Sequence, residues 1–224
     1  MNQIPEPAAR VTAVCVVHEV IPDPGGDVGV TAIDKRPVPG PVEVSRSRFG
    51  ADRCMDARHH GGPDQVVYAY ADEDAAWWAT ELGRQIPPGL FGENLRTAGL
   101  DLNGAEIGER WQFGAGDQAL VLELTCPRIP CVTFQRRIAE PHWVKRFTEH
   151  GAPGAYFRVL TPGAVRAGDA VTVVHRPGHG VSLRESFLGA ALGPMQRLIE
   201  AGDTGLIDLH PPLREFAAKV VARG

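Results

Sequence analysis

The hydrophobic residues of this chain fall into short runs that end at glycine, proline or aspartate. The run Val11–Val20 is rich in β-branched residues and ends at a cluster of proline, aspartate and glycine at 22–26, which predicts a strand followed by a loop. Comparable runs are found at Val42–Val44, Val66–Tyr70, Trp111–Phe113, Ala119–Thr125, Ala155–Leu160 and Ala170–His175. Many short strands separated by turn residues predict a mainly β fold, as a closed or strongly bent β-barrel.

A few short helices are predicted between these strands. Ala75, Trp78 and Leu82 fall at helical spacing along one face of a segment. Asp72 precedes that face and is predicted to cap the helix. A second short helix is predicted near 141–149. Because the helices do not alternate with the strands, a parallel doubly wound sheet is not indicated.

The pattern changes after His175, where a segment rich in glycine and proline is followed by helical sequence. Ser182 and Glu185 have the spacing of a capping box, which opens a helix. Further helices are predicted near 194–201 and 211–222. The chain is therefore predicted to have a β-barrel domain at 1–176 and a helical extension of three helices at 181–224.

Composition and charge exclude several classes of protein. With 43% hydrophobic and 22% charged residues, the 224-residue chain has a globular composition and is not disordered as a whole. Its formal net charge of −4 provides no basic field for a nucleic-acid polymer. No apolar run approaches the ~20 residues that cross a bilayer, and the first ten residues lack the apolar core of a signal peptide. We expect a cytoplasmic protein that does not bind membranes.

The four cysteines are Cys15, Cys54, Cys126 and Cys131, and no two of them form a C-x-x-C pair. This spacing indicates neither a disulfide framework nor the usual ligands of an iron–sulfur cluster or structural zinc. Cys131 follows Arg128 in a segment that two prolines stiffen, and a nearby guanidinium favours the thiolate needed for metal ligation or nucleophilic attack. The competing interpretation is a buried cysteine that acts as a small hydrophobe, and the local sequence alone favours it.

Two further segments carry candidate binding groups. His60 precedes Gly61 and Gly62, whose backbone amides can approach a ligand that a side chain would block, and the histidine can donate to an anion. A tight turn with a solvent-facing histidine is the alternative. Asn94 lies in the segment Phe91–Leu95, and its amide can both donate and accept at the edge of a heterocycle. The alternative is a turn asparagine that bonds its own backbone.

Taken together and in this order, the separated motifs resemble the MOSC domain family, named after the C-terminal part of molybdenum-cofactor sulfurase. The motifs are Lys35 with Gly40–Val42, Ala51–Arg53, His60–Gly62, Phe91–Leu95 with Gly99–Leu100, Ile107–Gly108 and Pro127–Cys131. The resemblance covers residues 11–174 and is strongest to the bacterial YiiM-like branch, which carries a three-helix extension. Ala51 departs from the pattern, because the family usually has glycine there.

The resemblance implies a MOSC-type β-barrel, a molybdopterin-type molybdenum cofactor and reduction of N-hydroxylated compounds, with 6-hydroxylaminopurine as the associated substrate and detoxification as the role. It implies that Cys131 is the metal ligand and a catalytic residue. His60 is the candidate proton donor by residue type, since its unperturbed pKa is ~6.5. The residues implied around the cofactor are Lys35, His60, Gly61, Asn94, Arg128 and Cys131.

The sequence contains no Gly-x-Gly-x-x-Gly fingerprint and no cysteine set for a cluster, so a separate electron-donor protein is expected. The helical extension is a candidate docking place for that donor or for a second subunit in a homodimer, and it can equally cover a barrel opening. Two alternatives to the reductase remain. One is a sulfur-carrier protein with a persulfide on Cys131, and the other is a non-catalytic module that binds a pterin or purine.

Overall fold

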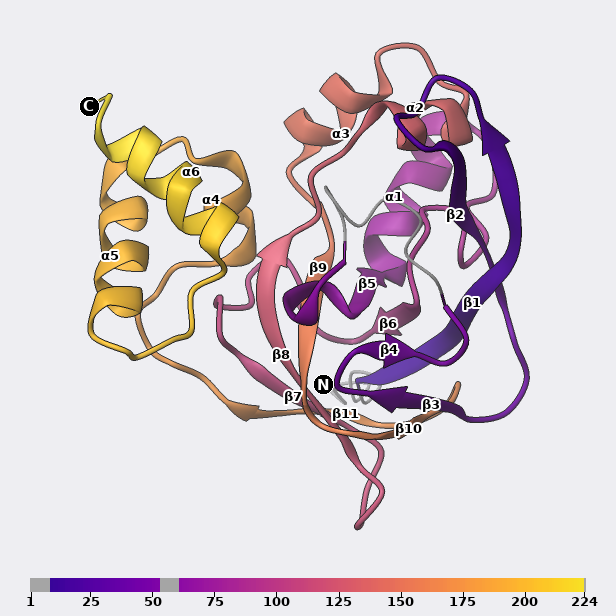
Figure 1. Cartoon of the computed structure of the whole chain (residues 1–224), viewed down its shortest axis with the longest axis horizontal. Helices are drawn as coiled ribbons and strands as arrows, with labels where there is room; N and C mark the ends of the chain where they lie inside the picture. The colour runs from indigo at the N-terminus through magenta and orange to yellow at the C-terminus, as the bar shows by residue number, and fades with distance from the viewer. Residues whose placement is uncertain (1–8, 53–60, 224) are drawn as a thin grey trace, which may run out of the picture.

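The computed structural model describes residues 9–52 and 61–223, and most of the strands in this part of the chain belong to one large mixed sheet (Figure 1). In spatial order this 8-stranded sheet contains β11 (Val171–His175), β7 (Arg110–Phe113), β8 (Leu120–Pro127), β9 (Ala155–Thr161), β5 (Val67–Ala71), β6 (Leu95–Ala98), β1 (Arg10–Asp23) and β2 (Gly29–Pro37). A second sheet contains β10 (Gly163–Val165), β3 (Val42–Ser45) and β4 (Arg48–Phe49). The predicted mainly β class is confirmed.

The large sheet is strongly bent, mainly at β1. This strand pairs with both β6 and β2, and its register shifts between Val11 and Ala13 and again between Val17 and Ile21, as bulges do when they bend a strand. The bend brings β1 towards β11 at the opposite edge, where the Val171 N–H donates to the Ala9 carbonyl at 2.9 Å. Between the described parts of these edges there is an isolated bridge and no ladder, so the predicted closed barrel is not confirmed.

The helix α1 (Asp72–Leu82) lies where a helix was predicted, but its start differs from the prediction. Ala71 occupies the N-cap position with extended backbone, and no side chain caps the helix, so the predicted Asp72 cap is wrong. The reason is that β5 runs directly into the helix. Asp72 then lies in the first turn, where a carboxylate still interacts favourably with the helix dipole.

Two further helices, α2 (Val132–Ile138) and α3 (Trp143–His150), pack with α1 through aromatic side chains. Phe134 of α2 lies 5.4 Å from Trp143 of α3, and Trp143 lies 4.4 Å from Trp78 of α1, measured between ring centroids. The predicted helix near 141–149 corresponds to α3, whereas α2 was not predicted. This aromatic cluster, which also includes Phe91, supports the segment that begins at Cys131.

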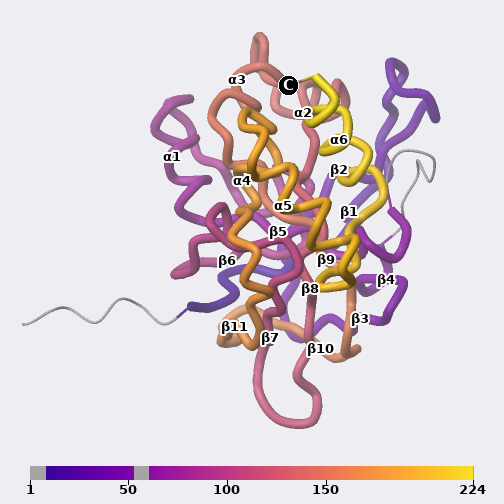
Figure 2. Tube along the Cα trace, turned by 90° about the vertical axis from the view of Figure 1, so that its left-hand side faces the viewer, coloured from indigo at the N-terminus to yellow at the C-terminus, as the bar shows by residue number. Residues whose placement is uncertain are grey.

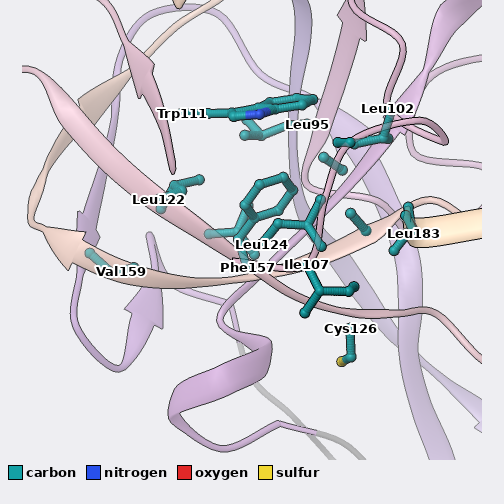
Figure 3. Packing of buried hydrophobic residues seen from close by; sticks show 14 of the residues in the cluster. Leu95, Leu102, Ile107, Trp111, Leu122, Leu124, Cys126, Phe157, Val159 and Leu183 are labelled. Atoms are coloured by element: carbon teal, nitrogen blue, oxygen red, sulfur yellow. The ribbon is translucent and has the colours of Figure 1, made fainter. Parts of the chain in front are cut away.

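The main hydrophobic core lies against the large sheet and continues into the C-terminal helices. Figure 3 shows Trp111, Leu122, Leu124 and Phe157 close together, with Cys126 at one edge of the group. Leu183, from the first helix of the extension, belongs to the same core, so the sheet and the extension share one apolar cluster.

The extension contains α4 (Leu183–Leu188), α5 (Leu192–Asp203) and α6 (Pro211–Val221), which correspond to the three predicted helices. The predicted capping box is confirmed, because Ser182 accepts from the Glu185 N–H and the Glu185 side chain accepts from the Ser182 N–H. Figures 1 and 2 show these helices beside β7, β8 and β9. In the described part of the chain, no helix is long and apolar enough to cross a membrane. The domain boundary at 176–181 stays a prediction.

Candidate functional site

A cavity of about 270 Å³ gathers the predicted site residues that the structure describes. Its lining includes Lys35 from β2, Gly61 before the short 3₁₀ helix η1 (Pro63–Gln65), Asn94, Arg128 and Cys131. We call it the Cys131 cavity. His60 lies outside the described residues, so its predicted roles remain predictions. These residues come from four separate parts of the sequence, and the bent sheet with its loops brings them to one place.

Cys131 stands at the N-cap position of α2, with extended backbone at φ −126° and ψ 172°. Its side chain is half-buried and packs partly against the aromatic cluster while it lines the cavity. By contrast, burial raises the pKa of the Cys15 thiol to about 12 and that of Cys126 to about 11. Cys131 is therefore not the fully buried hydrophobe that the local sequence favoured, and of the described cysteines it is the one on this cavity.

Arg128 is buried, with an exposed fraction of 6%, and its guanidinium carbon lies 3.6 Å from the centre of the Phe134 ring. A second ring, that of Tyr68, lies 5.5 Å away. Within the described residues, Nη1 of Arg128 has no hydrogen-bond partner. A buried N–H without a partner costs ~1–3 kcal/mol, more when the group is charged. Arg128 also belongs to the lining of the Cys131 cavity, so the aromatic rings hold a cationic side chain in a fixed place at its wall.

Lys35 is held in place by a carboxylate that the sequence analysis left without a role. Its Nζ lies 2.8 Å from Oδ2 of Asp52, while Oδ1 of Asp52 accepts from the Val17 N–H at 2.7 Å. Both side chains are mostly buried, with 14% and 13% of their surface exposed. Asp52 thus restricts the position of the ammonium group on the cavity wall.

Asn94 has its amide groups occupied by the protein. Nδ2 donates to Oδ2 of Asp52 at 2.7 Å and to the Cys15 carbonyl at 3.4 Å, and Oδ1 accepts from the Tyr68 N–H at 3.2 Å. These partners are distant in sequence, so Asn94 is not the turn asparagine of the alternative interpretation. It lines the cavity and ties Asp52 to the sheet, and its contact with a cofactor stays a prediction.

The loop that carries Asn94 depends on a buried ion pair. Glu93 is fully buried and accepts from the Gly89 N–H at 2.7 Å, the Phe91 N–H at 3.0 Å and Nε of Arg96 at 2.8 Å. Gly89 has φ +86°, and a Cβ there would lie 2.3 Å from the Lys35 carbonyl oxygen. Glycine is therefore required for this loop to approach β2 beside Lys35.

Gly61 and Gly62 adopt positive φ values of 88° and 82°, which explains the glycine pair. The Gly61 N–H donates to Oε1 of Gln65 at 3.1 Å, and the Gln65 N–H donates to the Gly62 carbonyl at 3.2 Å. The segment is thus a tight turn that also lines the Cys131 cavity. This geometry agrees with the predicted tight turn and also with glycine backbone amides that approach a ligand in the cavity.

Side chains from α2 fasten the β1–β2 hairpin over the cavity. Nε of Arg136 donates to Oδ1 of Asp23 at 2.7 Å, and the Thr133 hydroxyl donates to its Oδ2 at 2.7 Å. The hydrogen bond from Arg136 lowers the pKa of Asp23. On the same helix, Arg137 donates to Asp34 of β2 at 2.5 Å. We call these two ion pairs, Arg136–Asp23 and Arg137–Asp34, the hairpin clamp. They were not predicted from the sequence, because neither α2 nor β2 was predicted.

Comparison with known proteins shows one family. The MOSC domain model matches residues 56–172. The chain is 34% identical over 154 residues to the uncharacterized protein YflK of Bacillus subtilis, which covers 69% of this chain and 68% of that protein. It is 29% identical over 150 residues to YiiM of Escherichia coli, with 65% of each chain covered.

A Gibberella moniliformis protein named "Reductase" is 30% identical over 160 residues, which are 68% of this chain but 27% of that protein. Among solved structures, YiiM from Geobacillus stearothermophilus has a TM-score of 0.75 at 23% identity, and the match covers 95% of this chain and 99% of that one. At this identity the likeness shows the fold, and its coverage includes the helical extension.

Proposed function

The chain belongs to the MOSC domain family and is YiiM-like, and from this premise we propose that it is a reductase of N-hydroxylated compounds that holds a molybdopterin-type molybdenum cofactor in the Cys131 cavity. The substrates proposed are bases of the 6-hydroxylaminopurine kind. The relative named as a reductase supports an oxidoreductase role. The remainder of the proposal rests on the chemistry of the cavity.

One observation carries the proposal: a half-buried thiol and a buried guanidinium with an unpartnered N–H line the same cavity. A molybdenum pterin has a soft metal centre at one end and a phosphate at the other, so it needs a thiolate and cationic donors. Cys131 supplies the thiolate, and Arg128 with Lys35 supplies the cations. The donor set therefore fits this group.

When bound, the cofactor would supply the two electrons that convert R–NHOH and two protons to R–NH₂ and water. The residues of the chain would bind and orient the cofactor and the substrate. Cys131 would hold the metal, Arg128 and Lys35 would neutralise the phosphate, and Asp52 with Asn94 would keep Lys35 in position. A side chain must also deliver a proton to the leaving oxygen, and His60 remains the proposed donor.

The electrons are proposed to come from a separate donor protein, because the sequence has no nicotinamide fingerprint and no cysteine set for a cluster. The helical extension is the proposed docking place for this donor protein or for a second subunit in a homodimer.

The test is the metal and pterin content of the protein from a cofactor-producing host, compared with that of Cys131→Ser. We expect stoichiometric molybdenum in the wild type and its loss in the variant, because serine offers no soft ligand. Cys126→Ala is the matched control and should keep its molybdenum, since Cys126 does not line this cavity.

Two outcomes would contradict the proposal. Absence of molybdenum together with a cyanide-labile sulfur on Cys131 would identify a sulfur carrier. Bound cofactor without reduction of any N-hydroxylated base, in the presence of chemically reduced donors, would identify a binding module.

A further inference from the structure

A second cavity, of about 400 Å³, lies between the sheet and the helical extension. We call it the extension cavity. Its walls are mostly apolar and include flat proline and aromatic side chains from β8, α4 and α6. The apolar lining includes Cys126, Pro127, Ile129, Phe187, Pro212, Leu213 and Phe216. Figure 2 shows the helices of the extension in front of β8 and β9. Residues from β8, β9, α4 and α6 line the cavity.

The segment that follows β8 separates the two cavities. Along it, Pro127 and Ile129 line the extension cavity, whereas Arg128 and Cys131 line the Cys131 cavity. Successive side chains of an extended segment point to opposite sides, which accounts for Arg128 lining a different cavity from Pro127 and Ile129. Cys131 lies beyond Pro130 at the N-cap of α2, where the extended segment ends. Because the wall is one chain thick, a ligand in the extension cavity would lie close to the thiol and the guanidinium.

Gln65 and Tyr156 line both cavities, so the two spaces also meet at a common edge. Nε2 of Gln65 makes a long contact of 3.8 Å with Sγ of Cys126, and thiol sulfur is a weak acceptor. Oε1 of Gln65 is held by the Gly61 N–H, so Nε2 is the part of this amide with only a weak partner, and it can donate to a better acceptor on a ligand.

His210 adds a second polar group to the apolar walls. Its Nδ1 lies 2.9 Å from Oδ2 of Asp64, whose other oxygen lies 3.2 Å from Nε of Arg158. A carboxylate accepts hydrogen bonds, so Asp64 places the imidazole proton on Nδ1 and leaves Nε2 as an acceptor when the ring is neutral. The cavity thus combines an amide and an imidazole with flat apolar faces.

We propose that the extension cavity binds the planar heteroaromatic ring of the substrate, a base of purine size, with its N-hydroxylamino group at the edge shared with the Cys131 cavity. This inference rests on the proposed function and names the place of its substrate. Flat apolar walls stack on a ring, while Gln65 and His210 recognise nitrogen atoms at its edge. Gln65 and His210 favour a base as the occupant over an apolar side chain of a partner protein, because such a side chain would leave both polar groups without a partner.

The binding test uses the cofactor-free full chain with adenine as the probe, in isothermal titration calorimetry. We expect one adenine per chain. Ile129 is 63% exposed and stands at the wall, so Ile129→Trp should block the cavity without disturbing the core. Its affinity for adenine should fall about tenfold or more, a loss of ~1.4 kcal/mol.

Leu206→Trp is the matched control, because Leu206 is 49% exposed and does not line the cavity. It should bind adenine as the wild type does. A second variant, Phe216→Ala, removes a stacking face at a side chain that is 38% exposed, and it should also weaken adenine. Thermal unfolding would verify that all variants fold. No adenine binding by the wild type, or equal affinity in Ile129→Trp and Leu206→Trp, would overturn the inference.

Turnover by the cofactor-loaded enzyme separates this inference from the proposed function. The ratio of kcat/KM for an N-hydroxylated base to that for a small aliphatic N-hydroxylamine should fall about tenfold in Ile129→Trp and stay constant in Leu206→Trp. An unchanged ratio in an active Ile129→Trp enzyme would contradict binding of the base in the extension cavity and would leave the proposed reductase activity unaffected. If the cofactor-loaded wild type reduces neither compound, the proposed reductase activity is wrong. The affinity for adenine would then still test whether the extension cavity binds a base.

Discussion

The two cavities share a wall but are built from opposite kinds of interaction. The Cys131 cavity has charged side chains such as Lys35, Asp52 and Arg128 among apolar ones, and neighbouring buried ion pairs hold its walls in place. The extension cavity is lined mainly by hydrocarbon that belongs to the packing of α4 and α6 on the sheet. One segment, 127–131, serves both, because Pro127 and Ile129 line the extension cavity while Arg128 and Cys131 line the Cys131 cavity. One short segment can thus contribute to a cavity suited to a charged group and to a neighbouring cavity suited to a flat ring.

The largest expected effect comes from breaking the ion pair behind the Cys131 cavity. Glu93→Ala leaves Arg96 as a buried charge without its main partner, and such a loss costs ~3–5 kcal/mol in the free energy of unfolding. Urea denaturation would measure it, with Glu43→Ala on the exposed side of β3 as the control. A loss below ~1 kcal/mol would show that the loop does not depend on this pair.

A smaller loss is expected on the hydrocarbon side. Leu213→Ala removes a side chain that is 5% exposed and should cost ~2–3 kcal/mol, at the low end of core truncations because the neighbouring cavity already leaves space. The same urea denaturation checks it. A cost equal to that of an exposed position, such as Leu206→Ala, would mean that the extension packs loosely on the sheet.

Arg128→Met sharpens the comparison by keeping the stacking on Phe134 and removing the charge. We expect a stability change within ~1 kcal/mol, since an unpartnered buried N–H disappears with the cation. Molybdenum content should fall about tenfold, as for the loss of a charge-assisted hydrogen bond of ~1.5 kcal/mol. Arg110→Met, on the sheet surface, is the control. Unchanged molybdenum content would remove Arg128 from the site.

Asp52→Asn tests the support of Lys35. The amide oxygen can still accept from the Val17 N–H, but the attraction to the ammonium and the hydrogen bond from Nδ2 of Asn94 are lost, because the new amide nitrogen is itself a donor. Molybdenum content should fall about twofold to threefold, since a partly exposed ion pair contributes ~0.5 kcal/mol. Asp203→Asn, at the end of α5, is the control. A loss as large as that of Arg128→Met would show that Asp52 does more than hold Lys35.

The smallest effect concerns the pH dependence of the hairpin clamp. Arg136 lowers the pKa of Asp23 in the folded protein, so this contribution is complete above the unfolded pKa of ~3.9 and is lost as the pH falls through the folded value. The melting temperature of the wild type should therefore fall more steeply below about pH 4 than that of Asp23→Asn. Parallel curves would show that the clamp does not contribute.

Elements with a strong local pattern could be predicted from the sequence. β1 and β8 are dense in β-branched and aliphatic residues, and the capping box at Ser182 uses only neighbours in the chain. The strands β2, β4, β6 and β10 and the helix α2 were not predicted. β2 is mostly half-exposed with polar residues, β4, β6 and β10 have two to four residues each, and α2 is a short helix after a proline-rich segment. The stability of β2 and α2 comes from pairing with β1 and from packing on the aromatic cluster, which local patterns do not show.

The site was predictable to a similar extent. Motif order brought together Lys35, Gly61, Asn94, Arg128 and Cys131, and the structure places all of them on one cavity. The supporting carboxylates of Asp52 and Glu93 lay within those motifs and received no role. The partners of Asp52 are 17, 35 and 42 residues away, whereas those of Glu93 are two to four residues away, and in each case burial gives the contact its importance.

The sequence by itself determined most strands of the large sheet, the capping box at Ser182 and which residues carry a thiol or a charge, because these depend on residue type and on neighbours along the chain. Tertiary structure alone decided which side of 127–131 each side chain faces, that Arg128 is buried on a ring with an unpartnered N–H, and that a second cavity lies beneath the extension. Those features depend on the bend of the sheet and on the space left where α4 and α6 meet it, and both are set by contacts between distant residues.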